Sequence, residues 1–435
     1  MRLTKSISEL KEMFYKDENN NLVLNIFWNS LYIAFFLLPL DINFPTPFFI
    51  VSIIFGCINI FKSPKKYVSE NKMLLLFPLY FIVITLSLIY TENLSDGVAL
   101  VQRSLTLLLF PVIFLFVKED ALSVRKLFDF LLLGLIVSFF INLSFAVNDS
   151  LLAAKTDNAL EASVSQFSLW IGALINGWDY FIGSEFSRLV SPSYVSLYIL
   201  LVLSFYLKKK LNSRLKFLVV IILFLYLYLL ASSAAYFILM IMSLLLIFNI
   251  TERSKKYSML IIFVLGTIVF LKNPRIFEFE ESGNPGDYNA TISENARLLS
   301  WNASLEAIKE APFFGYGIGD ANDVLTRKYR ELNYQENYDK QYNSHNQFFQ
   351  TWMQTGVLGI GILITIIILL AIQMRRSRNE FSVFLILFIS LLFESMLVRF
   401  NGIVFFSIIV PLLLKKRSIL GSRIIRNEAA FKNNP

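Results

Sequence analysis

The chain has 435 residues, 56% of them apolar, and a mean hydropathy of +0.59. Apolar runs long enough to cross a bilayer core of roughly 30 Å recur along it, which excludes an ordinary water-soluble globular protein. The formal net charge is +8, but the basic residues are dispersed at the ends of the apolar runs, so the charge is weak evidence for nucleic-acid binding.

Twelve apolar segments are predicted to be membrane-spanning helices, so the expected fold class is all-α and polytopic. The polar N-terminus lacks a small-residue cleavage site, and the first span is therefore expected to be an uncleaved anchor. The predicted spans are 22–40, 44–61, 73–90, 99–117, 127–147, 189–207, 217–231, 234–250, 257–271, 348–373, 381–398 and 403–414.

The distribution of basic residues predicts the orientation. With the N-terminus in the cytoplasm, the inner segments hold 28 of the 40 Lys and Arg residues, as the positive-inside rule requires. The expected organisation is a cytoplasmic N-terminus, nine spans with an outer loop between the fifth and sixth, a large outer loop, three more spans and a cytoplasmic tail. The corresponding ranges are 1–21, 22–271 with the loop 148–188, 272–347, 348–414 and 415–435.

The large outer loop is expected to form a partly helical cap. Thr291-Ile292-Ser293-Glu294 has the pattern of a helix-capping box. It precedes apolar residues at helical spacing, namely Leu298, Trp301, Leu305 and Ile308. Pro312 and the glycines that follow it are expected to end this helix. Because both long loops lie outside and no internal repeat is found, the layout favours an enzyme over a two-half transporter.

The chain has one histidine, His345, at the end of the large loop. An imidazole has an unperturbed pKa of about 6.5, which suits proton transfer near neutral pH. Ser344 and Gln347 are spaced as a second capping box, which would put His345 in the first helical turn, where the dipole favours the neutral base. Asn346 and Gln350 are candidates for orienting a sugar hydroxyl, or equally for capping and helix–helix hydrogen bonds. A chance interfacial histidine is the alternative reading.

Several charged residues lie near the loops or in spans. Arg188 and Arg297 stand in the two long loops, Arg103 and Arg399 lie in or beside spans, and Glu394 lies inside the eleventh span. Ionisable groups at membrane depth usually face a polar interior, although an arginine such as Arg103 can also reach lipid headgroups. Guanidinium groups grip phosphate oxygens through two donors, so two or three of them can stabilise a diphosphate leaving group without a metal.

Metal and disulfide chemistry have little support in the sequence. Cys57 and His345 are the only residues of their types, which is too few for a zinc site or an intramolecular disulfide. Asp320 and Asp323 are spaced for a helix face or a turn rather than as a metal-binding Asp-x-Asp pair. No metal and no cofactor are therefore expected.

The ordered pattern resembles the signature region of the O-antigen ligase and polymerase family. Its elements are Arg297-x3-Trp301, Pro312-x2-Gly315-x-Gly317-x-Gly319 and His345-Asn346-x3-Gln350-x5-Gly356-x2-Gly359. Glu394-x4-Arg399-x2-Gly402 also resembles the end of the domain in many members.

This resemblance implies a GT-C-like, metal-independent inverting glycosyltransferase of the bacterial inner membrane, with its active site on the periplasmic face. The donor would be a polyprenyl-diphosphate-linked glycan. The acceptor would be a sugar hydroxyl of lipid A–core in a ligase, or of another lipid-linked glycan in a polymerase. By carry-over, Arg188 and Arg297 would hold the diphosphate and His345 would activate the acceptor, with Trp301, Asn346, Gln350, Arg103, Glu394 and Arg399 in support.

One departure from the family pattern concerns the turn between spans seven and eight. Many members carry a Ser-Arg pair there, whereas this chain reads Ser232-Ser233-Ala234. Either Arg103 or Arg399 replaces the missing cation, or the donor is held differently. We expect Arg188, Arg297 and His345 within about 10–15 Å of each other around one outward-opening cavity. The sequence slightly favours a ligase over a polymerase; an exporter of lipid-linked glycan and a purely structural membrane protein are alternatives from other classes.

Overall fold

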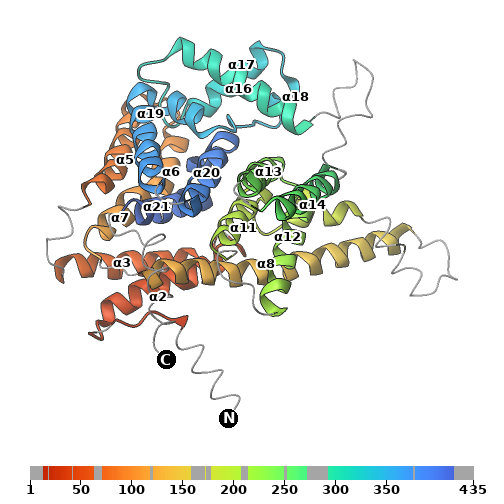
Figure 1. Cartoon of the computed structure of the whole chain (residues 1–435). Coiled ribbons are helices and arrows are strands. Elements are labelled where there is room, and N and C mark those ends of the chain that lie inside the picture. Colours follow the sequence, from red (N-terminus) through yellow and green to blue (C-terminus); the bar gives the residue numbers. More distant parts are fainter. Residues whose placement is uncertain are drawn as a thin grey trace. The chain divides into compact units, whose positions relative to one another are not determined.

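The computed structural model describes residues 13–17, 19–41, 43–62, 71–117, 121–157, 172, 178–206, 214–248, 252–271, 292–375 and 378–415 (Figure 1). Every regular element in these ranges is a helix, as the apolar patterns predict. Most of the N-terminal segment, much of the loop 148–188, the capping residue Thr291 and nearly all of the C-terminal tail lie outside the described residues.

The chain forms two compact units. The first comprises Met1–Ala34, Thr46–Leu127 and Thr291–Pro435, and the second comprises Phe35–Pro45 and Phe128–Ala290. Arg297 and His345 therefore belong to the first unit, whereas Arg188 belongs to the second.

The second unit is built around a buried tyrosine. Its helices are most of α8 (Ala121–Asp157), η3 (Trp178–Phe181), α10 (Gly183–Phe186), α11 (Pro192–Tyr206), α12 (Arg214–Leu230), α13 (Ser233–Phe248) and α14 (Arg253–Leu271). The Tyr226 hydroxyl lies 2.8 Å from Ser138 Oγ and accepts a hydrogen bond from Asn142 Nδ2 at 2.9 Å. These contacts satisfy a phenol that would be costly to bury alone.

The first unit packs helices from both ends of the sequence together. The N-terminal part contributes α2 (Leu22–Leu37), α3 (Thr46–Lys62), η1 (Lys72–Leu75), α5 (Leu76–Leu86), η2 (Ser87–Tyr90), α6 (Leu94–Ser104) and α7 (Thr106–Phe114). The C-terminal part contributes α16 (Ile292–Glu310), α17 (Ala321–Glu331), α18 (Gln335–Asp339), α19 (Gln347–Met374), α20 (Arg378–Phe393), η4 (Met396–Val398) and α21 (Phe400–Leu414). Helix α21 is buried from Asn401 to Leu414 and packs against α7 and α19, so it lies at the centre of this unit.

The apolar helices are those of a membrane protein. Four segments are long and apolar enough to span a bilayer, namely Lys72–Tyr90, Leu94–Phe114, Ser123–Ala153 and Gln347–Met374. Shorter apolar helices occupy other predicted spans, including Thr46–Lys62 and Phe400–Leu414. An all-helical polytopic class is therefore confirmed, whereas the number of twelve spans stays a prediction.

Two helices end at residues other than the predicted ends of their spans. Helix α8 continues to Asp157, past the expected end at 147, because the following residues include strong helix formers such as Leu151, Leu152 and Ala153. Helix α20 ends at Phe393, so Glu394 lies in a break between helices rather than inside a span. The side chain of Gln347 helps to satisfy this break, since its Oε1 accepts the Leu397 N–H at 2.6 Å.

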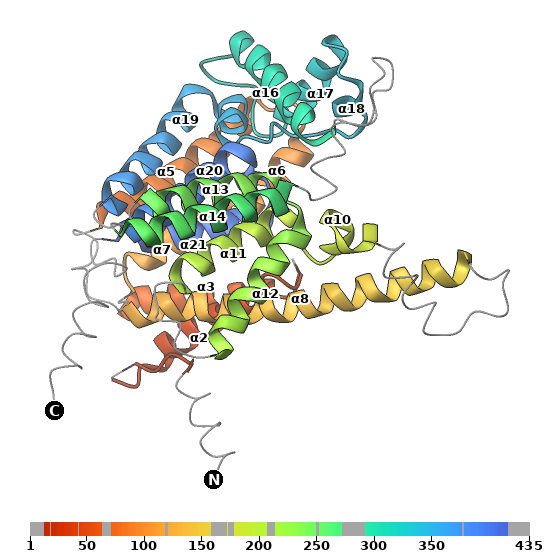
Figure 2. The same ribbon diagram turned by 45° about the vertical axis from the view of Figure 1, so that its right-hand side comes forward.

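Helices α16 to α18 form a small folded layer at one end of α19 (Figures 1 and 2). Ala303 and Ala307 of α16 share an apolar core with Leu325 and Tyr329 of α17. At its edge, Lys328 Nζ pairs with Glu310 and Glu331, each at 2.6 Å. The predicted helix after Glu294 is confirmed, and it ends before Pro312 as expected.

The linker between α16 and α17 docks on α19 through two glycines with left-handed backbones. Gly315 has φ 70° and Gly356 has φ 61°. The Tyr316 N–H donates to the Met353 carbonyl at 2.7 Å, and the Val357 N–H donates to the Phe313 carbonyl at 3.0 Å. A Cβ on Gly356 would lie 2.0 Å from that Phe313 oxygen, so only glycine fits this approach.

We expect Gly356→Ala to lower the thermal unfolding midpoint of the detergent-solubilised protein by at least a few degrees. A left-handed backbone alone costs a non-glycine residue of order 1–3 kcal/mol, and the Cβ clash adds to that cost. Gly361→Ala is the matched control, because the space beside Gly361 in the same helix is open within 4 Å. Size-exclusion chromatography after heating measures both midpoints, and equal values for the two variants would contradict the docking role.

Candidate active site

His345 lies just before α19, in a left-handed backbone conformation with φ 45°. Its N–H donates to Asn343 Oδ1 at 2.9 Å, which stabilises this turn. The cap of α19 is Asn346, whose Oδ1 accepts the N–H groups of Phe348 and Phe349. The expected Ser344–Gln347 capping box is therefore wrong, because Asn346 supplies the cap and leaves His345 outside the helix.

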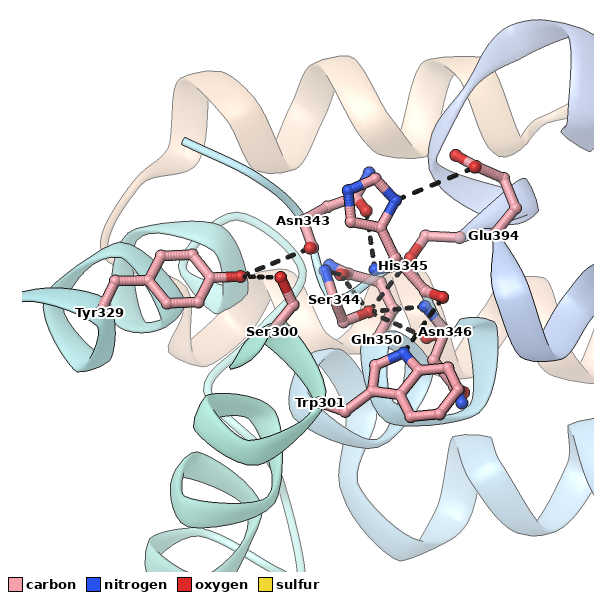
Figure 3. Close-up of polar contacts among 10 residues, drawn as sticks. Ser300, Trp301, Tyr329, Asn343, Ser344, His345, Asn346, Gln350 and Glu394 are labelled. Atoms are coloured by element: carbon pink, nitrogen blue, oxygen red, sulfur yellow. Dashed lines mark hydrogen bonds and ion pairs between the residues drawn. The ribbon is translucent and has the colours of Figure 1, made fainter. Parts of the chain in front are cut away.

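The turn around His345 is held from within by Ser344 (Figure 3). Ser344 Oγ donates to the Asn346 carbonyl at 2.8 Å and lies 3.0 Å from Ser395 Oγ. Gln350 Oε1 accepts from the Ser344 N–H at 3.3 Å, while its Nε2 donates to Asn322 Oδ1 at 3.0 Å. Gln350 is fully buried, so its amide joins the turn to α17.

Two aromatic residues support the same turn from α16 and α17. Trp301 Nε1 donates to the His345 carbonyl at 3.4 Å. The Tyr329 hydroxyl lies 2.9 Å from Ser300 Oγ and 3.2 Å from the Tyr342 carbonyl. Burial raises the pKa of Tyr329 to about 12, which keeps this phenol protonated and able to donate.

The imidazole of His345 faces Glu394 from the break after α20 (Figure 3). His345 Nδ1 lies 3.9 Å from Glu394 Oε2, and the two side chains are 20% and 15% exposed. The pair is thus mostly enclosed but still reachable from outside. The Tyr342 ring packs edge-on to the imidazole, with centroids 5.3 Å apart, which restricts its rotation.

Cationic groups act on the Glu394 carboxylate. Burial opposes its charged form, but the nearby His345, and the positive charges of Arg297 and Arg399, outweigh burial and hold the pKa of Glu394 below its usual range. Arg297 lies one turn before Trp301 in α16, and Arg399 is the exposed residue that precedes α21. Four of the predicted site residues, namely Arg297, His345, Glu394 and Arg399, are therefore electrostatically linked.

Two other predicted arginines have different surroundings. Arg188, in the second unit, forms an ion pair with Asp149 of α8, and its side chain is 41% exposed. Arg103 is exposed in the last turn of α6. The gathering of Arg188 with Arg297 and His345 around one cavity stays a prediction.

Asp320 and Asp323 hold a turn of the first unit. The Asp320 carboxylate accepts the Glu92 and Asn93 N–H groups at 2.8 and 2.7 Å, and Asp323 accepts from Asn93 Nδ2 at 2.9 Å. Both carboxylates thus fix the start of α6 against α17. Within the described residues, no group of three or more His, Cys, Asp or Glu side chains is arranged to hold a metal ion.

Several residues of the site carry no recognisable signal in the sequence. Ser395 and Tyr342 contact the His345 turn, and Asp149 pairs with Arg188, yet none of them belongs to a motif. In the sequence, the spacing of Arg297 and Trp301 on one helix face was the pattern that pointed to a role for α16 beside His345.

Comparison with known proteins identifies the domain that contains much of this site. Residues 186–364 match the family model described as O-antigen ligase. The matched range includes Arg188, Arg297 and His345, but ends before Glu394 and Arg399.

A protein of Haemophilus influenzae described as uncharacterized is 36% identical over 81 residues. The match covers 18% of this chain and 20% of the relative, so the chain aligns with about a fifth of that protein. The family match supports a membrane enzyme that processes glycans. Residues 186–364 therefore resemble the O-antigen ligase family, in a chain whose apolar helices make it a membrane protein.

Proposed function

We propose that the protein is a glycosyltransferase that moves a polyprenyl-diphosphate-linked glycan onto a sugar hydroxyl, as an O-antigen ligase acting on lipid A–core. The observation that carries the proposal is the pairing of His345 with Glu394, at 3.9 Å, beside the positive charges of Arg297 and Arg399. A base and several fixed cations are the two requirements of a transfer that expels a diphosphate.

His345 acts as the general base. Its Nδ1 faces the Glu394 carboxylate, so a proton on Nδ1 leaves the Nε2 lone pair free for the acceptor hydroxyl. The acceptor oxygen attacks the anomeric carbon as Nε2 takes its proton, and the bond to the diphosphate oxygen breaks with both electrons. Attack from the face opposite the leaving group inverts the configuration. Glu394 stabilises the imidazolium that forms.

Arginines hold the diphosphate in place of a metal. Arg297 and Arg188 each offer a planar fork that matches phosphate oxygens and keeps its charge at any accessible pH. Asp149 orients Arg188 by pairing with it. Arg399, which acts on Glu394 and is exposed, is the better replacement for the cation absent near Ser233, because Arg103 has no such link to the site.

The orientation of the helices supports a periplasmic site in the inner membrane. His345 precedes α19, and the basic Arg375 follows the other end of that helix. The positive-inside rule assigns the Arg375 end to the cytoplasm, which leaves His345 on the opposite face. A lipid-linked donor displayed on that face can reach both the base and the arginines.

We expect His345→Asn to reduce transfer by about 10²–10⁴-fold, the usual contribution of a general base. Asparagine tolerates the left-handed backbone that His345 adopts, so the turn should persist and donor affinity should be retained. The measurement is transfer by purified variant from a lipid-linked donor, with binding of that donor followed separately.

Glu394→Gln is the companion variant for the base. It keeps the shape of the side chain but removes the charge, so it should lower kcat while leaving KM and donor binding near normal. Added chelator should not affect the wild type. Near-normal turnover in His345→Asn, or loss of wild-type activity on chelation, would exclude this mechanism.

Lysine should not replace the two arginines that bind the diphosphate. Arg297→Lys and Arg188→Lys keep a positive charge but lose the two-donor fork, so donor affinity should fall in both. Lys309→Arg, at an exposed position of α16, is a control that should behave as wild type. Full activity and donor affinity in Arg297→Lys would indicate a structural or headgroup contact instead.

The second candidate function is polymerisation of lipid-linked repeats, because both branches share the family motif. In cells that make such a glycan, loss of a ligase should leave polymerised glycan on the polyprenyl carrier, whereas loss of a polymerase should leave single repeats. Gel analysis of the lipid-linked fraction separates them. Accumulation on the cytoplasmic leaflet alone would instead support an exporter.

A further inference from the structure

Two neighbouring phenylalanines project from the linker between α16 and α17. Phe313 and Phe314 are 71% and 70% exposed, although both are large apolar side chains. Tyr90 and Ile89 at the end of η2 are also exposed, at 43% and 82%. A contiguous exposed apolar patch of this kind marks a surface that contacts a membrane or another apolar partner.

The exposure of these side chains is imposed by a fixed backbone. The Phe313 carbonyl accepts the Val357 N–H at 3.0 Å, and the Phe314 carbonyl accepts the Tyr90 hydroxyl at 2.8 Å. Trp352 Nε1 donates to the Pro312 carbonyl at 2.9 Å. The linker is thus bonded to both η2 and α19, and it holds the two rings outward.

The phenylalanine pair continues two apolar stripes. Helices η1, α5 and η2 expose Leu75, Leu79, Ile82, Leu86 and Ile89, at intervals of three and four residues. Helix α19 exposes Leu358, Ile364, Ile368 and Ile372. Because α5 and α19 pack together and each belongs to a candidate membrane span, these stripes are surfaces for lipid.

The length of the helices sets the depth of the pair. From Val357 to Met374, α19 rises about 27 Å at roughly 1.5 Å per residue, which nearly matches a hydrocarbon core of about 30 Å. Arg375 follows its far end, and Lys72 begins the other span, which ends at Tyr90. Since basic residues mark the cytoplasmic side, the Val357 and Tyr90 ends lie at the outer boundary of the core, where aromatic residues concentrate.

We propose that Phe313 and Phe314 form a membrane wedge, embedded in the outer leaflet at the boundary between headgroups and acyl chains. The wedge joins the layer of α16 to α18 to the bilayer, and through Trp301 and Tyr316 it fixes the height of the His345 turn above the lipid. The inference rests on exposure and helix length, and it holds whichever reaction the site performs.

The test measures the immersion depth of a spin label at Phe314 in the full-length protein. Phe314→Cys is introduced into a Cys57→Ser background, labelled, and reconstituted at one copy per phosphatidylethanolamine–phosphatidylglycerol nanodisc. Power saturation then compares collision with oxygen, which enriches in lipid, and with a water-soluble nickel chelate. Leu358→Cys provides a lipid-facing reference, and Arg327→Cys, exposed on α17, provides an aqueous one. Phe313→Cys is the second variant if the first does not fold.

The expected oxygen-to-nickel collision ratio at position 314 is close to that at 358 and several-fold above that at 327. A ratio equal to that at 327 would place the rings in water and overturn the proposal. Exclusion of both reagents would mean that protein covers the pair, which would also overturn it. An aqueous reading at both 314 and 358 would overturn the membrane depth assigned to α19.

Discussion

The close backbone approach of the α16–α17 linker to the kink of α19 is the contact on which the first unit depends. Gly356 and Gly315 each lack the Cβ that would block it, and their left-handed conformations let two main-chain hydrogen bonds form across the contact. Once α16 is joined to α19 in this way, Trp301 reaches the His345 carbonyl. The His345 turn is therefore built on a helix–linker junction with a closely constrained backbone.

The polar side chains that surround the His345 turn bond to one another and to the backbone, while the imidazole stays partly exposed. Ser344, Gln350 and Asn346 are buried. Ser344 bonds within the turn, Gln350 bonds to α17, and Asn346 accepts the first N–H groups of α19. A turn held this way is preorganised, because the rotamers that support it are fixed by packing. Asn346 caps α19, and Gln350 joins the turn to α17.

The end of α20 at Phe393 places a charged carboxylate beside His345. A carboxylate inside a continuous span would face a large desolvation cost, whereas Glu394 lies in a break beside His345, Arg297 and Arg399, which favour its charged form. Charge pairing also governs Arg188 in the second unit, where Asp149 is its partner.

The amino-acid sequence alone determined the all-helical membrane class and the helix after Glu294, and it singled out His345, Arg297 and Trp301 as candidate site residues. Hydropathy, basic loops and helical spacing are local signals, because each depends only on residues that are close together in the sequence. It also allowed a capping box at Ser344 that the structure does not form, because α19 begins two residues later, where Asn346 accepts the N–H groups of Phe348 and Phe349. Only the tertiary structure decided that Glu394 and Ser395 meet the His345 turn and that Asp320 serves the start of α6. Those partners are distant in sequence, and packing of whole helices, rather than any spacing of residues, brings them together.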